Sequence, residues 1–198
     1  MAPIQDPTAF LELATQWLAL GTWIAWLSLG TGHAHAETGD LVQDRGTRAW
    51  TTIIGLGSLF AAVGLAEALP WGRISVAAWG LRAAGSTLVL LGIGLREWAV
   101  WTLGRFFTQT VLIRAGHHVV TSGPYRVLRH PAYAGTLMTF VGLILALGNW
   151  ASLALVIVGF FASHVPRIRV EERVLEERLG EPYVEFERTR KRLIPGVW

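Results

Sequence analysis

Long apolar runs alternate with short polar segments along this chain, and the runs have the length of membrane-spanning helices. The hydrocarbon core of a bilayer is about 30 Å thick, so a helix needs about 20 apolar residues to cross it. Five runs approach this length, at about residues 10–29, 50–69, 76–95, 131–147 and 151–165. The pattern therefore predicts an all-α, polytopic membrane helix bundle of about five transmembrane helices.

The last two runs are joined by a tight turn, Gly148-Asn149-Trp150, which predicts a helical hairpin. From Arg167 onward the chain is charged, and its apolar residues recur at helical spacing. We therefore expect a C-terminal helical segment outside the membrane. Within it, Glu187 and Lys191 stand four residues apart, a spacing that allows an ion pair on a solvated helix face.

Small residues mark two expected helix contacts. Gly57 and Ala61 in the second run, and Gly80 and Ala84 in the third, have the small-xxx-small spacing. In lipid, such pairs let helix backbones approach each other closely. We expect both pairs to lie at helix interfaces.

Composition agrees with a membrane protein. The chain has 198 residues, of which 52% are hydrophobic and only 16% charged, whereas soluble domains carry about 25% charged residues. The length predicts a single integral membrane domain, 1–198, in which N-terminal transmembrane helices over 1–104 are followed by a second half over 105–198. The sequence holds no cysteine, which excludes disulfides, zinc thiolate sites and cysteine nucleophiles.

Two features of the N-terminal region need a separate interpretation. Ala34-His35-Ala36 resembles a signal-peptide cleavage site, but no basic residue precedes the first apolar run, which argues for a retained helix. His33 and His35 form a His-x-His pair without a third ligand at nearby spacing. We interpret this pair as a loop feature and predict no metal site.

Positive charge orients the predicted helices. The basic residues on one side are Arg45, Arg48, Arg105, Arg114, Arg126, Arg129 and all those from Arg167 onward. The opposite loops offer only Arg73. The positive-inside rule therefore places the polar segments and the C-terminus in the cytoplasm and the N-terminus outside. The arginines form no aromatic-interleaved stripe, so a nucleic-acid partner is not expected.

The polar segment 117–135 concentrates the reactive side chains. It contains three histidines, two arginines, two tyrosines and two prolines within a very apolar chain. Pro131 opens the fourth run, and proline is favoured at the first position of a helix. Arg129 and His130 should therefore lie at a helix N-terminus, where free N–H groups and the helix dipole favour anions.

A second polar cluster follows the fifth run. Arg167 and Glu171 are four residues apart and share one helical face. The hairpin should bring Arg129 and His130 close to them. Cationic donors, carboxylates and aromatic rings beside a lipid-accessible bundle suit a small zwitterionic cofactor with a carboxylate, an amine and hydroxyls.

Four short motifs in the second half of the chain carry a family resemblance. They are Thr121-Ser122-Gly123-Pro124-Tyr125, Arg129-His130-Pro131-Ala132-Tyr133-Ala134-Gly135, Glu171-Glu172 and Leu179-Gly180-Glu181-Pro182-Tyr183. Together they resemble the isoprenylcysteine carboxyl methyltransferase family and the wider membrane phospholipid methyltransferases, over about residues 105–195. The short N-terminal half is similar to the compact prokaryotic members, which favours a bacterial inner membrane.

The resemblance implies an integral membrane methyltransferase that uses S-adenosylmethionine, with a cofactor-binding catalytic half over 105–198. Its acceptor would be lipophilic or membrane-associated, either an isoprenylcysteine-type carboxylate or a lipid head group. By position, the implied catalytic residues are Arg167, Glu171 and Glu172. The implied cofactor-binding residues are His117, Val119, Tyr125, Arg129, His130, Tyr133, Glu171 and Tyr183. Two choices stay open, between His117 and His118 and between Glu171 and Glu172, as do the acceptor and the oligomeric state.

Two other functions stay open at this level. The C-terminal half is also similar to membrane sterol reductases, which would use NADPH, although the transmembrane core is much shorter and no further phosphate-binding basic patch is present. A non-catalytic membrane interaction protein is the other alternative. It predicts no binding of S-adenosylmethionine at all.

Overall fold

The computed structural model describes residues 41–42, 46–69, 72–74, 78–108, 112–113 and 116–198. The chain divides into two compact units, 1–35 and 36–198, and every described residue lies in the second. The elements are β1 (Leu41–Val42), α2 (Thr47–Ala68), α3 (Ala78–Leu103), η2 (Gly104–Phe106), β2 (Leu112–Ile113), η3 (Gly123–Arg126), α4 (Pro131–Leu147), α5 (Trp150–Leu179) and α6 (Glu181–Thr189). The first predicted span and the His33–His35 pair lie outside the described residues, and the division into an N-terminal and a catalytic half stays a prediction.

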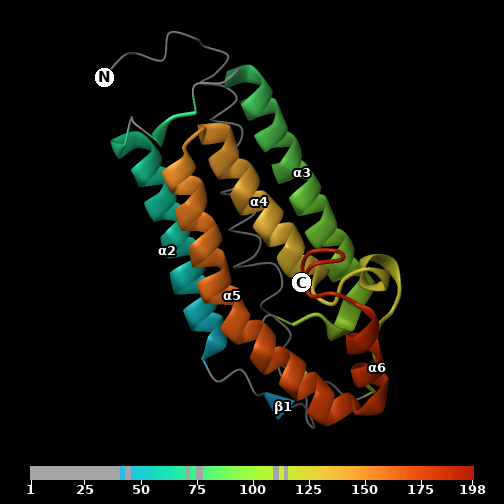
Figure 1. Cartoon of the computed structure of the whole chain (residues 1–198). Helices are drawn as coiled ribbons and strands as arrows, with labels where there is room; N and C mark the ends of the chain where they lie inside the picture. Colours follow the sequence, from blue (N-terminus) through green and yellow to red (C-terminus); the bar gives the residue numbers. More distant parts are fainter. Residues whose placement is uncertain (1–40, 43–45, 70–71, 75–77, 109–111, 114–115) are drawn as a thin grey trace. The chain divides into compact units, whose positions relative to one another are not determined.

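The predicted helical membrane bundle is confirmed. In the described part of the chain, three helices are long and apolar enough to cross a membrane, at Thr47–Ala66, Trp79–Phe106 and Trp150–Leu179. Helix α4 has 17 residues, or about 26 Å at 1.5 Å per residue. The helices α2, α5, α4 and α3 lie side by side (Figure 1). The strands β1 and β2 form only a two-residue antiparallel ladder.

Helix α5 passes through the predicted end of the fifth span without a break, so a single helix contains both the fifth apolar run and the start of the charged segment. Pro166 lies inside the helix. Because proline lacks an N–H, the Ala162 carbonyl loses its intrahelical donor. The Trp50 indole N–H on α2 donates to that carbonyl at 3.2 Å, and the Thr51 hydroxyl donates to the Ser163 carbonyl at 3.2 Å. Donors from α2 thus support α5 where the proline weakens its hydrogen bonding.

Helices α3 and α4 approach each other through glycines spaced seven residues apart. A Cβ on Gly92 would lie 2.6 Å from the Gly135 carbonyl oxygen, and one on Gly85 would lie 2.6 Å from the Gly142 carbonyl oxygen. Helix α4 packs mainly against α3, and α5 mainly against α2. The two helices of the predicted hairpin are therefore neighbours, but each has its largest interface elsewhere.

The small-residue pairs expected at interfaces face away from them. Gly57 and Gly80 are exposed, and a Cβ on either would meet no atom of the described residues within 4 Å. Ala61 and Ala84 are also exposed. The small-xxx-small spacing is present in both helices, but it does not tell which side of a helix packs, because the neighbouring helices decide that.

Asn149 joins two helices at the turn between α4 and α5. It is 1% exposed. Its Oδ1 accepts the Ser152 N–H at 3.1 Å and so caps the N-terminus of α5, while its Nδ2 donates to the Leu69 carbonyl at 3.0 Å, just after α2. The left-handed Gly148, with φ of 65°, ends α4. The predicted tight turn is confirmed, and it also ties α5 to α2.

The glycine contact between α3 and α4 can be tested with a matched pair of substitutions. We expect Gly92→Ala to destabilise the fold by about 1–3 kcal/mol, because the new methyl group meets backbone atoms of α4. Gly94→Ala is the control, since a Cβ there meets nothing within 4 Å. Thermal unfolding in detergent should show a lower midpoint for Gly92→Ala only. Equal midpoints for the two variants would contradict the close helix contact.

Candidate active site

Polar side chains gather where α4 begins, opposite the Asn149 turn. The segments around residues 117–135 and 167–173 meet there, as the sequence predicts. Figure 1 shows α6 folded back beside this end of the bundle, and α6 packs with the ends of α3 and α4 in one hydrophobic cluster. The site is therefore built from elements far apart in the chain.

Arg167, Tyr133 and Glu171 form a hydrogen-bonded chain. The Arg167 Nε donates to the Tyr133 hydroxyl at 2.8 Å, and that hydroxyl donates to Glu171 Oε2 at 2.8 Å. Arg167 Nη1 also donates to the Thr47 hydroxyl at 3.4 Å. Arg167 is only 6% exposed, so partners on α2 and α4 fix its guanidinium. Arg167 and Glu171 share one face of α5, as their spacing predicts, and Tyr133 bridges them.

A row of rings leads from this chain into the bundle. The Tyr133 ring stacks on His130 at 5.6 Å and meets the edge of His164 at 5.4 Å. His164 stacks on Phe160 at 3.9 Å, and Phe160 meets Phe140 edge-on at 6.3 Å. Tyr133 and Phe140 belong to α4, His164 and Phe160 belong to α5, and His130 directly precedes α4. They give the polar end of the site an apolar continuation toward the membrane interior.

Three of the predicted cofactor-binding residues, Val119, Tyr125 and Tyr183, belong to one hydrophobic cluster. Burial raises the pKa of Tyr125, and the Glu171 carboxylate raises it further. Burial also raises the pKa of Tyr183, as do the carboxylates of Glu172 and Glu171. Both hydroxyls therefore stay protonated at neutral pH and remain hydrogen-bond donors.

Burial distinguishes the doubled histidines. The His117 ring lies flat on Phe106, with centroids 4.6 Å apart, whereas His118 meets Phe106 edge-on at 5.0 Å and is exposed. Burial lowers the pKa of His117, as does the neighbouring His118, while Glu171 opposes the shift. Among the described residues, the buried Nδ1 of His117 has no hydrogen-bond partner. The supporting Phe106 ring was not predicted from the sequence.

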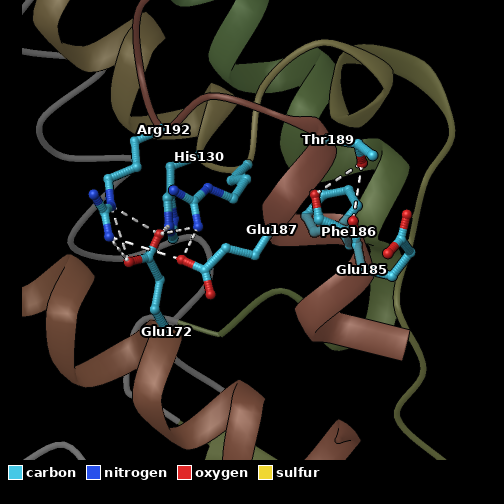
Figure 2. Close-up of polar contacts among 8 residues, drawn as sticks. His130, Glu172, Glu185, Phe186, Glu187, Thr189 and Arg192 are labelled. Carbon is cyan, nitrogen blue, oxygen red and sulfur yellow. Dashed lines mark hydrogen bonds and ion pairs between the residues drawn. The ribbon is translucent and has the colours of Figure 1, made fainter. Parts of the chain in front are cut away.

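Arg129, His130 and Glu172 belong to a cluster of charged groups that Figure 2 shows around the Glu172 carboxylate. Glu172 Oε1 lies 3.2 Å from His130 Nε2 and 3.2 Å from Arg129 Nη1. Arg192 donates to both carboxylate oxygens of Glu172, and its shortest contact is 2.7 Å. Glu187 pairs with Arg129 and lies 3.8 Å from Arg192.

Sequence reasoning missed two members of this cluster, Glu187 and Arg192. Lys191 lies beyond the end of α6 at Thr189, so the helical spacing that would let it pair with Glu187 is absent, and Glu187 contacts Arg129. The partners are 58 residues apart for Glu187 and 20 residues apart for Arg192. Helical periodicity carries no signal at such separations.

The described part of the chain is thus a membrane helix bundle with a polar site at one end. A profile of the family described as phospholipid methyltransferase matches residues 81–182, slightly more than half of the chain. The chain therefore belongs to this family, and the family expected from the sequence motifs is confirmed.

Relatives of known activity are membrane methyltransferases. Protein-S-isoprenylcysteine O-methyltransferase B of Arabidopsis thaliana is 39% identical over 113 residues, which are 54% of this chain and 56% of the relative. The human protein-S-isoprenylcysteine O-methyltransferase is 32% identical over 136 residues, 66% of this chain and 45% of the relative. The chain spans about half the length of these relatives.

A solved structure supports the same fold. The eukaryotic intramembrane Ras methyltransferase ICMT, an isoprenylcysteine carboxyl methyltransferase, has a TM-score of 0.60 and 26% sequence identity to this chain. The match covers 74% of this chain and 52% of that one.

The lowered pKa of His117 predicts a specific pH dependence. The unfolded state takes up a proton near the ordinary histidine pKa of 6.5, while the folded state resists it. Acidification below that value therefore favours unfolding. We expect the melting temperature of the native protein to fall more than that of His117→Gln between about pH 7.5 and pH 5.5. Melting curves that run parallel over this range would contradict the prediction.

Proposed function

We propose that this protein transfers a methyl group from S-adenosylmethionine to a lipophilic carboxylate of the isoprenylcysteine type. The observation that carries the proposal is the Arg167–Tyr133–Glu171 chain at the end of a row of rings, in a chain whose relatives methylate isoprenylcysteine. A polar reacting centre next to apolar aromatic rings suits an acceptor with a charged head and a hydrocarbon tail.

The residues around Glu171 fit the donor. When bound, S-adenosylmethionine supplies a methyl group on positively charged sulfur. Glu171 provides negative charge that acts on Tyr125, Tyr183 and His117, and the two protonated tyrosines offer hydroxyl donors. The Nδ1 of His117, which has no hydrogen-bond partner in the described part of the chain, offers a further polar contact. Val119 contributes an apolar wall.

Arg167 is the group that would orient the acceptor. An arginine recognises carboxylates through a fixed set of N–H donors, and Tyr133 and Thr47 hold this one in place. A carboxylate is already ionised at neutral pH, so it needs no general base. Orientation of two reactants can contribute about 7–11 kcal/mol to lowering a barrier. The positive charge on sulfur and the negative charge on the carboxylate are both lost when the methyl group is transferred, so a site closed to water favours the reaction.

The description of the family favours a second acceptor class, the amine of a phospholipid head group. An amine must lose a proton before or during attack. Glu171 is the candidate base on α5, because its carboxylate lies in the polar chain of the site and accepts a hydrogen bond from Tyr133. The chemical stability of the product distinguishes the two acceptors, since an ester is cleaved by base and a methylamine is not.

We expect purified protein to transfer labelled methyl groups from S-adenosylmethionine to N-acetyl-S-farnesylcysteine and to form a base-labile ester that releases methanol. Tyr133→Phe should lower kcat/KM at least about tenfold, because it removes the hydroxyl between Arg167 and Glu171. Glu185→Gln, at an exposed position on α6, is the control.

Two results would contradict parts of this proposal. If methylation of phosphatidylethanolamine gives a base-stable product and the farnesylcysteine is not methylated, the acceptor is an amine and not a carboxylate. Failure of the folded protein to bind S-adenosylmethionine in calorimetry would overturn the methyltransferase assignment itself.

We also propose that the site faces the cytoplasm of a bacterial cell, with the protein in the inner membrane and the N-terminus outside, on the basis of the positive-inside rule. The chain has no cysteine, so single substitutions can be labelled without background. Arg188→Cys, at an exposed position near the site, should react with an impermeant maleimide only in inverted vesicles. Arg73→Cys, exposed between α2 and α3, should react only in right-side-out cells. The reverse pattern would overturn the orientation.

A further inference from the structure

The adjacent glutamates of α5 have different surroundings. Glu172 is 6% exposed, and its carboxylate contacts Arg129, His130 and Arg192. Glu171 is partly exposed, accepts a hydrogen bond from Tyr133 and lies on the same side of α5 as Arg167. One carboxylate is therefore enclosed by two guanidinium groups and an imidazole ring, and the other lies in the polar chain of the candidate site.

The partners of Glu172 are also joined through their backbones. The Arg129 N–H donates to the Lys191 carbonyl at 2.8 Å, and the His130 N–H donates to the Arg192 carbonyl at 3.0 Å. Leu128 and Lys191 form a parallel bridge. The chain after α6 therefore runs beside the segment that leads into α4, like a short added strand. The Glu172 carboxylate lies next to this pairing and contacts a side chain from each partner.

Charge balance makes Glu172 the central member of the cluster. The Arg129 side chain is 8% exposed and the Arg192 side chain 29%. Glu187, with 30% exposure, is the other carboxylate that contacts both arginines among the described residues. Removal of Glu172 would leave the two guanidinium groups and His130 with only the partly exposed carboxylate of Glu187 near them. Uncompensated positive charge on these partly buried arginines favours a conformation in which their side chains are exposed to water.

We propose that Glu172 is a positioning residue that fastens the C-terminal tail, residues 190–198, to the segment 128–130, while Glu171 is the carboxylate that acts at the reacting centre. This division rests on the proposed methyl transfer. His130 stacks on Tyr133, so the fastened segment directly supports the ring that joins Arg167 to Glu171. If the tail detaches, the part of the site that binds S-adenosylmethionine should become less ordered, while every reacting group stays in the protein.

The test compares Glu172→Gln with Glu171→Gln in the full chain. Trypsin can cut after Arg190, Lys191 and Arg192, so the rate of tail cleavage measures the fastening without any substrate. We expect Glu172→Gln to be cleaved at least about tenfold faster than the native protein, because a buried charge pair has lost one partner. Glu171→Gln should be cleaved at the native rate.

The kinetic constants give a second, independent measurement. We expect Glu172→Gln to raise the KM for S-adenosylmethionine about tenfold while kcat stays within about twofold, and Glu171→Gln to lower kcat at least about tenfold. Arg192→Gln keeps Glu172 and should reproduce the phenotype of Glu172→Gln, with the double substitution no worse than either single one. This second variant keeps the test valid if Glu172→Gln fails to fold.

The proposal is wrong if Glu172→Gln abolishes turnover while its tail remains as resistant to trypsin as in the native protein, because Glu172 would then act at the reacting centre. It is equally wrong if Arg192→Gln leaves both tail cleavage and KM unchanged. If the native protein transfers no methyl group but Glu172→Gln still frees the tail, the fastening survives and the proposed function fails.

Discussion

Backbone polar groups in a membrane must find partners inside the protein, and this constraint organises the bundle. Pro166 deprives the Ala162 carbonyl of its helical donor, and the Trp50 indole supplies a replacement from α2. At the other end of α5, Asn149 caps the helix and also donates to the Leu69 carbonyl after α2. Helices α2 and α5 are thus held together at two separate places by hydrogen bonds that neither helix makes alone.

This attachment also places the candidate site. Arg167 immediately follows the proline, and its guanidinium reaches Thr47 in the first turn of α2 and Tyr133 in the first turn of α4. Helix α5 continues without interruption from the apolar bundle into the polar site, so Glu171 lies one helical turn after Arg167 on the same face. Had the helix ended at the proline, the spacing between the two residues would not have set their geometry.

The bundle consists of two helix pairs, α2 with α5 and α3 with α4, and the site lies at the junction between them. Glycine contacts such as Gly92 with Gly135 fix the second pair. Across the junction, Tyr133 on α4 bonds to Arg167 and Glu171 on α5, and rings from both helices extend inward. The packing of helices and the chemistry of the site therefore depend on one another.

The sequence by itself determined the apolar helices from the second run onward, the Gly148 turn, the start of α4 at a proline and the shared face of Arg167 and Glu171, because each depends on neighbours a few residues away. Only the tertiary structure decided which glycines pack, that α5 continues past Pro166, and that Glu172 is enclosed by Arg129 and Arg192 while Glu171 meets Tyr133. Helical periodicity assigns residues to faces. It does not tell which face meets which neighbour, since those contacts join segments that are distant in the chain.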